Sequence, residues 1–228
     1  VKIALLSALL LGTLLPNFDV AVAAAGPTRI SLAGTWRFAL DGGDAGLRER
    51  WFEQTLPQRV MLPGSLPAQE IGNDITLDTK WTGDVGTDRW LKDPRYEKYR
   101  QPGNIKIPFF LQPGKHYVGP AWYQREFHLP KAWTGRRVVL TLERAHWETR
   151  VWLDGREVGS CDSLCTPHVY DLGVGLAPGP HTLTLRVNNQ MLVDIGSWSH
   201  SVSDHTQGNW NGIIGRIELS ATSPVYIL

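Results

Sequence analysis

Carboxylates are the first candidates for chemistry in this sequence, because two carboxyl groups held close together can serve as a nucleophile and an acid/base. None of the acidic residues in the loop-like regions stands in a motif that would bury one acid beside a second and raise its pKa. We therefore expect solvated loop carboxylates and no catalytic residue in this chain. The candidates considered are Asp78, Asp84, Asp88, Asp93, Glu97, Asp194 and Asp204.

The histidines and serines offer no stronger constellation. No serine stands in a Gly-x-Ser-x-Gly turn of the kind that exposes a nucleophile. The histidines lack His-x₃-His or comparable ligand spacing, so we expect no metal and no cofactor. This applies to five of the seven histidines of the chain, His146, His168, His181, His200 and His205.

Cys161 and Cys165 are the two cysteines of the chain. In an oxidising compartment they could close a small local disulfide, which is the favoured prediction, and otherwise they remain free thiols. A Cys-x₃-Cys pair without a second pair of cysteines or histidines nearby is poor zinc spacing.

Aromatic residues beside amides point to a different chemistry, the recognition of a sugar ring. A pyranose has an apolar C–H face that stacks on aromatic rings, and its hydroxyls pair with amides and carboxylates. Two regions of the sequence combine these residue types. They are Asn209, Trp210 and Asn211, and the region around Trp81, Trp90 and Asn104.

Each of these residues also has a purely structural interpretation. Trp210 could plug one end of the fold, and Asn104 and the asparagines beside Trp210 could stabilise turns through their own backbone. Trp36, Trp122 and Trp152 stand in alternating segments, where we expect core or interface packing.

The elements that must position these side chains are strands. Residues 33–40, 121–129, 137–143, 147–153 and 182–188 alternate apolar and polar side chains. A period of two is typical of strands with one buried face. Asp-Gly at 154–155 predicts a tight hairpin turn. Many short strands separated by turns predict an all-β, antiparallel sandwich of the jelly-roll type.

Residues 64–120 interrupt this rhythm. The segment is rich in Trp, Tyr and Phe among Gly, Asp, Lys and Pro, and is too aromatic for a disordered linker. We expect a long, ordered, aromatic-rich insertion, and such loops tend to carry function.

Length and charge exclude two classes of function. The chain has 228 residues and 23 basic against 22 acidic side chains, a formal charge of +1. That balance argues against an electrostatically driven nucleic-acid binder. The length is also too short for a (β/α)₈ barrel, which needs roughly 250 residues.

Residues 1–25 have the pattern of a secretory signal peptide. Lys2 precedes an apolar stretch over residues 3–15, and alanines over 21–25 offer a cleavage site. The apolar stretch is too short to span a membrane, which takes about 20 residues. We expect a secreted or periplasmic protein with no stable membrane insertion.

Four segments, in order, resemble a known family. They are LAGTWRFALD (32–41) with LPGS (62–65), GPAWYQREFHLP (119–130), VVLTLERAHWETRVWLDGREVG (138–159) and GNWNGIIGRIELS (208–220). Together they are similar to the N-terminal sugar-binding domain of family 2 glycoside hydrolases, the β-galactosidase, β-glucuronidase and β-mannosidase group.

The resemblance implies a galactose-binding-like jelly roll over residues 26–221. In that family an immunoglobulin-like domain follows, and then a barrel that carries the catalytic carboxylates. Residues 222–228 resemble the start of the immunoglobulin-like domain. The implied function is that of a non-catalytic domain of a secreted, β-galactosidase-like, retaining glycoside hydrolase. Its implied partners are an oligo- or polysaccharide and the other domains of the same polypeptide.

The resemblance also bears on single residues. In family β-galactosidases an asparagine of an Asn-x-x-x-Pro stretch reaches the sugar site, and GNIKIP (103–108) matches that stretch at Asn104. The aspartate that holds a metal ahead of the Gly-Ile motif has no clean counterpart. Asp204 is the nearest acid, at a different spacing, which weakens the implied metal and the implied galactose preference.

Two alternatives remain beside the accessory domain of an enzyme. A free-standing carbohydrate-binding module would be a lectin-like jelly roll with sugar affinity of its own. An interaction or adhesion domain would use the aromatic insertion as a protein-binding surface.

Overall fold

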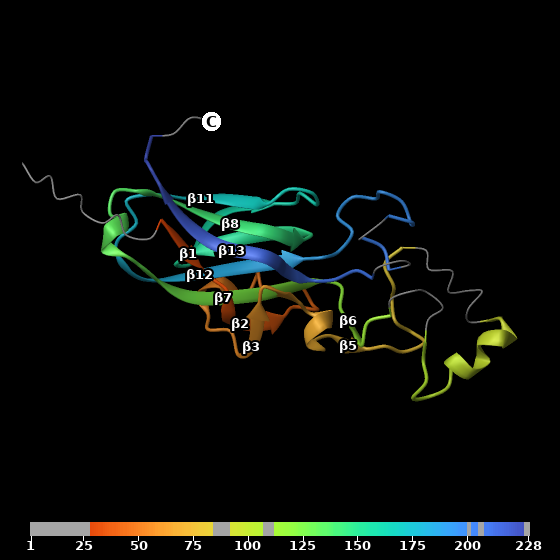
Figure 1. Cartoon of the computed structure of the whole chain (residues 1–228). Coiled ribbons are helices and arrows are strands. Elements are labelled where there is room, and N and C mark those ends of the chain that lie inside the picture. Colours follow the sequence, from red (N-terminus) through yellow and green to blue (C-terminus); the bar gives the residue numbers. More distant parts are fainter. Residues whose placement is uncertain (1–27, 84–91, 107–111, 200–201, 205–207, 226–228) are drawn as a thin grey trace, which may run out of the picture.

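The computed structural model describes residues 28–83, 92–106, 112–199, 202–204 and 208–225. Two antiparallel sheets lie face to face (Figure 1). The smaller sheet has the order β1 (Arg29–Ser31), β13 (Gly212–Thr222), β8 (Arg137–His146) and β11 (His168–Val174), and β4 (Gly64–Ser65) also pairs with β13. The larger sheet has the order β10 (Arg156–Cys161), β9 (Glu148–Leu153), β12 (Gly179–Asn188), β7 (Pro120–Leu129), β2 (Gly34–Leu40) and β3 (Gln58–Leu62). The all-β sandwich expected from the sequence is confirmed.

The core lies between the two sheets, where the alternation in the sequence places apolar side chains. Leu140 on β8 and Leu185 on β12 are both fully buried. Trp36 on β2 is also buried, and its Nε1–H donates to the carbonyl of Leu32 at 2.8 Å. A fully buried Leu contributes about 2 kcal/mol by leaving water, so this interface stabilises the pairing of the two sheets.

The outer face of the larger sheet is covered as well. Trp122 and Trp152 lie there with ring centroids 5.1 Å apart, and Phe52 stacks on Trp152 at 5.0 Å. Phe52 belongs to the segment over residues 44–56, which contains the short 3₁₀ helix η1 (Trp51–Glu53). Packing is therefore the role of Trp36, Trp122 and Trp152, as expected. Because both faces of β7 are buried here, simple alternation along the strand does not predict which residues are covered.

The hairpin predicted at Asp154 and Gly155 joins β9 to β10, with Leu153 paired to Arg156. Both turn residues have positive φ, 50° for Asp154 and 76° for Gly155. A two-residue turn of this kind matches the right-handed twist of its strands and favours Asp-Gly, which explains why the sequence signal was sufficient.

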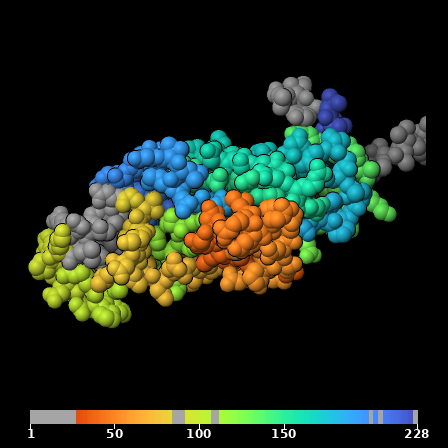
Figure 2. Space-filling model, turned by 180° about the vertical axis from the view of Figure 1, so that it is seen from behind, coloured from red at the N-terminus to blue at the C-terminus, as the bar shows by residue number. Residues whose placement is uncertain are grey.

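The insertion leaves the sandwich after β4 and returns at β7. Its described parts contain only short elements: the 3₁₀ helices η2 (Pro67–Gln69) and η3 (Pro94–Tyr99), and the strands β5 (Asn73–Asp74) and β6 (Lys115–His116), which pair with each other. The insertion projects from one end of the sandwich, and the loop that follows β12 lies beside it (Figure 2). The remaining 3₁₀ helix, η4 (Lys131–Trp133), lies at the other end.

No helix within the described ranges is long and apolar enough to cross a membrane. The predicted signal peptide over residues 1–25 lies outside the described residues. Residues 226–228, the last part of the terminal run over 222–228, also lie outside the described residues, and the start of a further domain there stays a prediction.

Candidate functional site

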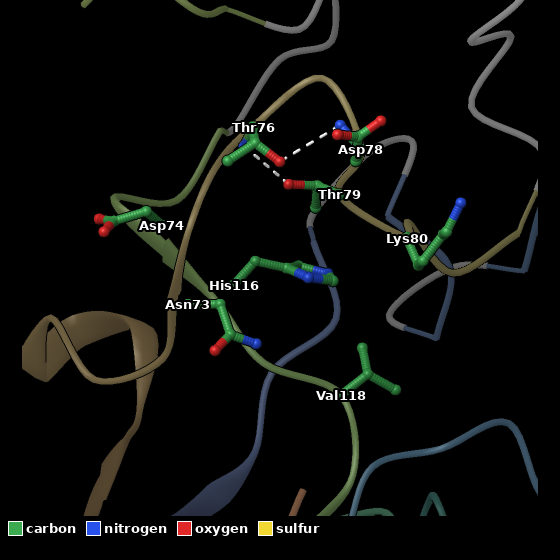
Figure 3. A pocket seen from close by; sticks show the side chains of 8 residues that line it. All are labelled: Asn73, Asp74, Thr76, Asp78, Thr79, Lys80, His116 and Val118. Carbon is green, nitrogen blue, oxygen red and sulfur yellow. Dashed lines mark hydrogen bonds between the residues drawn. The ribbon is translucent and has the colours of Figure 1, made fainter.

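A pocket of about 310 Å³ lies at the insertion end of the molecule, beside the β5–β6 pair (Figure 3). Its lining is polar except for one valine, and the imidazole of His116 points toward the middle of the group. A pocket of this size is at the lower end of the range for small-molecule sites. The lining residues are Asn73, Asp74, Thr76, Asp78, Thr79, Lys80, His116 and Val118.

A hydrogen-bonded turn shapes one wall of this pocket. The backbone N–H of Thr76 donates to Oγ1 of Thr79 at 2.8 Å, and the N–H of Asp78 donates to Oγ1 of Thr76 at 3.2 Å. Threonine hydroxyls that bond their own backbone in this way fix short turns. The turn therefore holds Asp78 and the following Lys80 in place at the edge of the pocket.

The charges around the pocket are nearly balanced. Lys115 Nζ pairs with Asp74 Oδ1 at 2.5 Å, while Lys80 and Asp78 form no ion pair with any described residue. One ammonium, one carboxylate, an amide and two hydroxyls are thus available to a ligand. This set suits a ligand with several hydroxyls and one acidic group.

Asp204 is the buried residue that ties the pocket to the sandwich. Its Oδ2 accepts from the N–H of Thr82 at 2.6 Å and lies 3.1 Å from Nε2 of His116. Its Oδ1 accepts from the N–H of Asn209 at 2.6 Å. The side chain is fully buried, so the expectation of a solvated loop carboxylate is wrong for Asp204. Burial is tolerated because these donors replace water around the carboxylate.

An aromatic contact supports the same region. The ring of Trp81 lies 4.6 Å from that of His116, centroid to centroid. This ring contact joins two segments of the insertion, and the next residue, Thr82, ties the insertion to Asp204 through its backbone N–H. Trp90, the other tryptophan expected in this region, lies outside the described residues.

Two of the predicted sugar-binding residues are buried and used internally. Asn209 and Asn189 bond each other side chain to side chain, with Asn189 Nδ2 donating to Asn209 Oδ1 at 2.9 Å. Asn211 Oδ1 accepts from the hydroxyl of Tyr123 at 2.7 Å, and its Nδ2 donates to the carbonyl of Gly119 at 2.9 Å. These amides cross-link the ends of the strands around β7, β12 and β13, and sugar contact by Asn209 or Asn211 stays a prediction.

Trp210 is the member of that group that reaches the surface. Its side chain is half-buried, and its ring lies 5.0 Å from that of His146 at the end of β8. His146 is buried, its Nε2 has no hydrogen-bond partner among the described residues, and burial lowers its pKa to about 4. The imidazole is therefore neutral at pH 7 and serves as a packing surface for Trp210.

Asn104 lies elsewhere, in the exposed part of the insertion. Its Nδ2 donates to the carbonyl of Lys98 at 2.6 Å, and its backbone N–H donates to the carbonyl of Gln101 at 3.0 Å. Within the described part of the chain, no hydrogen bond links it to Asn209, Trp210 or Asn211. The structure thus places Asn104 in a loop-stabilising position, and its predicted sugar contact is untested.

Both cysteines are free thiols in the structure. Cys161 ends β10 and is partly buried, while Cys165 is exposed in the loop that follows. The local disulfide is not formed here, and its formation on export stays a prediction. Among the described residues, no group of three or more His, Cys, Asp or Glu side chains could hold a metal ion.

The sequence of residues 30–222 matches the model of the glycosyl hydrolases family 2 sugar binding domain. The chain belongs to this family. The curated relatives of this family 2 domain include a β-glucuronidase from Paenibacillus borealis, 28% identical over 159 residues that cover 69% of this chain and 20% of the relative. Another is the β-glucuronidase of Canis lupus familiaris, 27% identical over 173 residues that cover 72% of this chain and 21% of the relative. The chain thus spans about a fifth of the length of these relatives.

Solved structures show the same fold. A β-glucuronidase from an uncultured Clostridium species covers 86% of this family 2 domain and 29% of its own chain, with a TM-score of 0.55 and 22% identity. A Ruminococcus gnavus β-glucuronidase in complex with uronic isofagomine matches with a TM-score of 0.53 and 20% identity. This match covers 85% of this chain and 28% of the Ruminococcus chain.

Sequence reasoning missed most of the pocket in this family 2 domain. The pocket joins β5 to β6 across 41 residues of chain, so no local spacing singles out Lys80 or His116. The one available signal was Thr-x-x-Thr at Thr76 and Thr79, a pattern that favours a hydroxyl-stabilised turn.

Proposed function

We propose that this chain is the non-catalytic sugar-binding domain of an exported family 2 glycoside hydrolase, and that the pocket beside β5 and β6 holds part of the carbohydrate substrate. The polar pocket itself carries the proposal, because an amide, a carboxylate, two hydroxyls and a lysine converge there. The relatives named β-glucuronidases support a glucuronide as that substrate, since the free ammonium of Lys80 could pair with a uronate carboxylate.

In this proposal the rest of the enzyme supplies the two catalytic carboxylates. Retaining hydrolysis needs a pair about 5 Å apart. We therefore expect no turnover of 4-nitrophenyl β-D-glucuronide by this chain alone, measured against a mock purification. Export is supported by the pattern of residues 1–25 and is checked by the mass of the protein recovered outside the cytoplasm.

Binding is tested by titrating the full chain with methyl β-D-glucuronide and methyl β-D-glucoside, followed by ligand-observed NMR. Asn73→Ala should weaken both sugars. Lys80→Ala should weaken the glucuronide by up to about fivefold and the glucoside less, because exposed charge pairs are worth at most about 1 kcal/mol.

Lys131→Ala, at the opposite end of the sandwich, is the matched control and should leave both affinities unchanged. If neither sugar binds, or if Asn73→Ala and Lys80→Ala bind as the unchanged chain does, the pocket is not the sugar site.

A further inference from the structure

The two sheets of the sandwich present neighbouring edge strands on one side. β10 is the edge of the larger sheet, and β11 is the edge of the smaller one. The two strands lie close together, and a Cβ added to Gly159 of β10 would lie 4.0 Å from the ring of Tyr170 on β11. They belong to different sheets, however, and each pairs only with its own sheet. The sandwich is therefore not closed by a strand ladder along this side.

A pocket of about 330 Å³ opens between these two edges. Its floor is apolar, with Leu153 at the end of β9, Val158 on β10, Leu172 on β11 and Leu176 in the loop after β11. All four side chains belong to the core between the sheets or pack against it. An apolar group that enters this pocket would therefore leave water for surroundings similar to those of a core side chain.

Hydrogen bonds fix the walls of this pocket. His181 bridges two of them, since its Nδ1 lies 2.6 Å from Oδ2 of Asp154 and its Nε2 lies 2.7 Å from the carbonyl oxygen of Ala177. Asp154 stands in the turn between β9 and β10, and Ala177 stands in the loop before β12. The N–H of Thr182 also donates to Oδ1 of Asp154 at 2.8 Å. A pocket that is preformed in this way loses little conformational entropy when a ligand enters.

Four charged side chains line the pocket, and three of them are carboxylates that already have partners. Asp154 is held by His181, and Glu157 and Asp171 each bind an arginine, at 2.6 Å and 2.8 Å. Arg156 is the fourth. It is exposed and forms no ion pair with any described residue. The charge available to a ligand is therefore a guanidinium, which can bind a carboxylate through two parallel N–H donors.

Arg156 also borders a larger hollow of about 510 Å³ on the other side of the turn. Phe52 is the only apolar side chain among the described residues that line this hollow, and its ring is stacked on Trp152. Glu126 lines it as well, with a side chain that is 72% exposed and 3.9 Å from its cation, Arg37. A loosely paired carboxylate disfavours an anion there. The pocket between β10 and β11 is thus the better place for a ligand of Arg156.

We propose that the pocket between β10 and β11 binds a small amphipathic anion, whose alkyl or aryl group fills the apolar floor and whose carboxylate pairs with Arg156. This ligand class lies beyond the proposed sugar-binding function. The pocket shares no lining residue with the pocket beside β5 and β6, and no aromatic platform for a sugar ring is among its described lining residues. A mostly apolar lining with one well-placed polar group is the usual composition of a small-molecule site.

The test uses the full chain with ¹³C-labelled leucine and valine methyl groups, followed by NMR. The probes are hexanoate and 3-phenylpropionate, each up to about 20 mM, a range that detects millimolar binding. Hexanamide is the uncharged counterpart of hexanoate, and acetate lacks the apolar group. We expect at least one of the two anions to shift the methyl resonances of Val158, Leu172 and Leu176, hexanamide to bind more weakly than hexanoate, and acetate to cause no shift.

Variants separate the contribution of the charge from that of the apolar floor. Arg156→Ala should raise the Kd of the bound anion by up to about fivefold and leave that of hexanamide unchanged, because an exposed ion pair adds only modestly to affinity. Leu176→Ala should raise both Kd values, since it removes apolar contact. Arg59→Ala is the matched control, because Arg59 is an exposed arginine of β3 at the opposite edge of the larger sheet, and it should change neither Kd.

Two results would overturn this site. One is that neither anion shifts the methyl resonances of Val158, Leu172 and Leu176. The other is that hexanamide binds as tightly as hexanoate and Arg156→Ala changes neither Kd, which would leave no role for the guanidinium. Glucuronide binding and its loss in Lys80→Ala report on the pocket beside β5 and β6 only, so the two proposals fail separately.

Discussion

Removing the carboxylate of Asp204 should loosen the insertion and lower the stability of the whole domain. The side chain is fully buried, accepts from two backbone N–H groups at 2.6 Å each, and pairs with His116 at 3.1 Å. Asp204→Ala leaves these donors buried without a partner. Each unsatisfied buried donor costs about 1–3 kcal/mol.

We therefore expect Asp204→Ala to lower the free energy of unfolding by about 4 kcal/mol, measured by urea denaturation at constant m-value. Asp204→Asn keeps one acceptor oxygen and should lose about half as much, which keeps the prediction testable if the alanine variant does not fold. Asp78→Ala, an exposed carboxylate of the same insertion, is the control and should change stability by less than about 0.5 kcal/mol.

Hydrogen exchange locates the effect. The amides of Thr82 and Asn209 should lose protection in Asp204→Asn before the strands of the core do. The reasoning would be refuted if Asp204→Ala cost less than about 1 kcal/mol and both amides kept their protection.

Three further predictions concern Gly83, His146 and Asn211. Gly83→Ala should lower the free energy of unfolding by more than about 2 kcal/mol, because φ is +87° and the new Cβ would lie 2.5 Å from atoms of Ser197 and Ser203. Gly103→Ala is the control. Its φ of +78° is similar but the space around it is open, so the same urea titration should show a loss of only about 1 kcal/mol. Burial lowers the pKa of His146 from 6.5 to about 4, so between these pH values the unfolded chain binds a proton that the native state excludes. The free energy of unfolding should therefore be at its full value above pH 6.5 and fall by up to about 3 kcal/mol toward pH 4. Urea midpoints of His146→Phe should depend less on pH. Asn211→Ala removes the hydrogen bonds to Tyr123 and Gly119 and should lower the free energy of unfolding by about 2–4 kcal/mol in urea. The folded variant should bind sugar as the unchanged chain does. Weaker sugar binding by a folded variant would instead support a binding role for Asn211.

The strands and turns were largely predictable from the sequence. Period-two alternation over residues 137–143 and 182–188 predicted β8 and β12, whose apolar residues are buried between the sheets. Asp154 and Gly155 predicted the hairpin, because a two-residue turn needs residues that tolerate positive φ. These signals are local, since strand geometry and turn conformation depend on residues a few positions apart.

The candidate sites were less predictable, because residues distant in sequence form them. Asp204 looks like an ordinary loop carboxylate until Thr82, His116 and Asn209 surround it. The aromatic–amide pattern at 209–211 indicated sugar contact, but Asn211 is enclosed by Tyr123 and Gly119. An amide has the same hydrogen-bonding capacity in a binding site and in the core, so its sequence context does not distinguish the two roles.

The sequence by itself determined the sandwich, its hairpin and the family likeness, because alternation, turn chemistry and motif order are properties of short segments. Only the tertiary structure decided which polar groups line the pocket beside β5 and β6 and which are buried. That outcome depends on which groups distant in the sequence reach hydrogen-bond distance and exclude water from one another, as the backbone N–H of Thr82 and the carboxylate of Asp204 do across 122 residues.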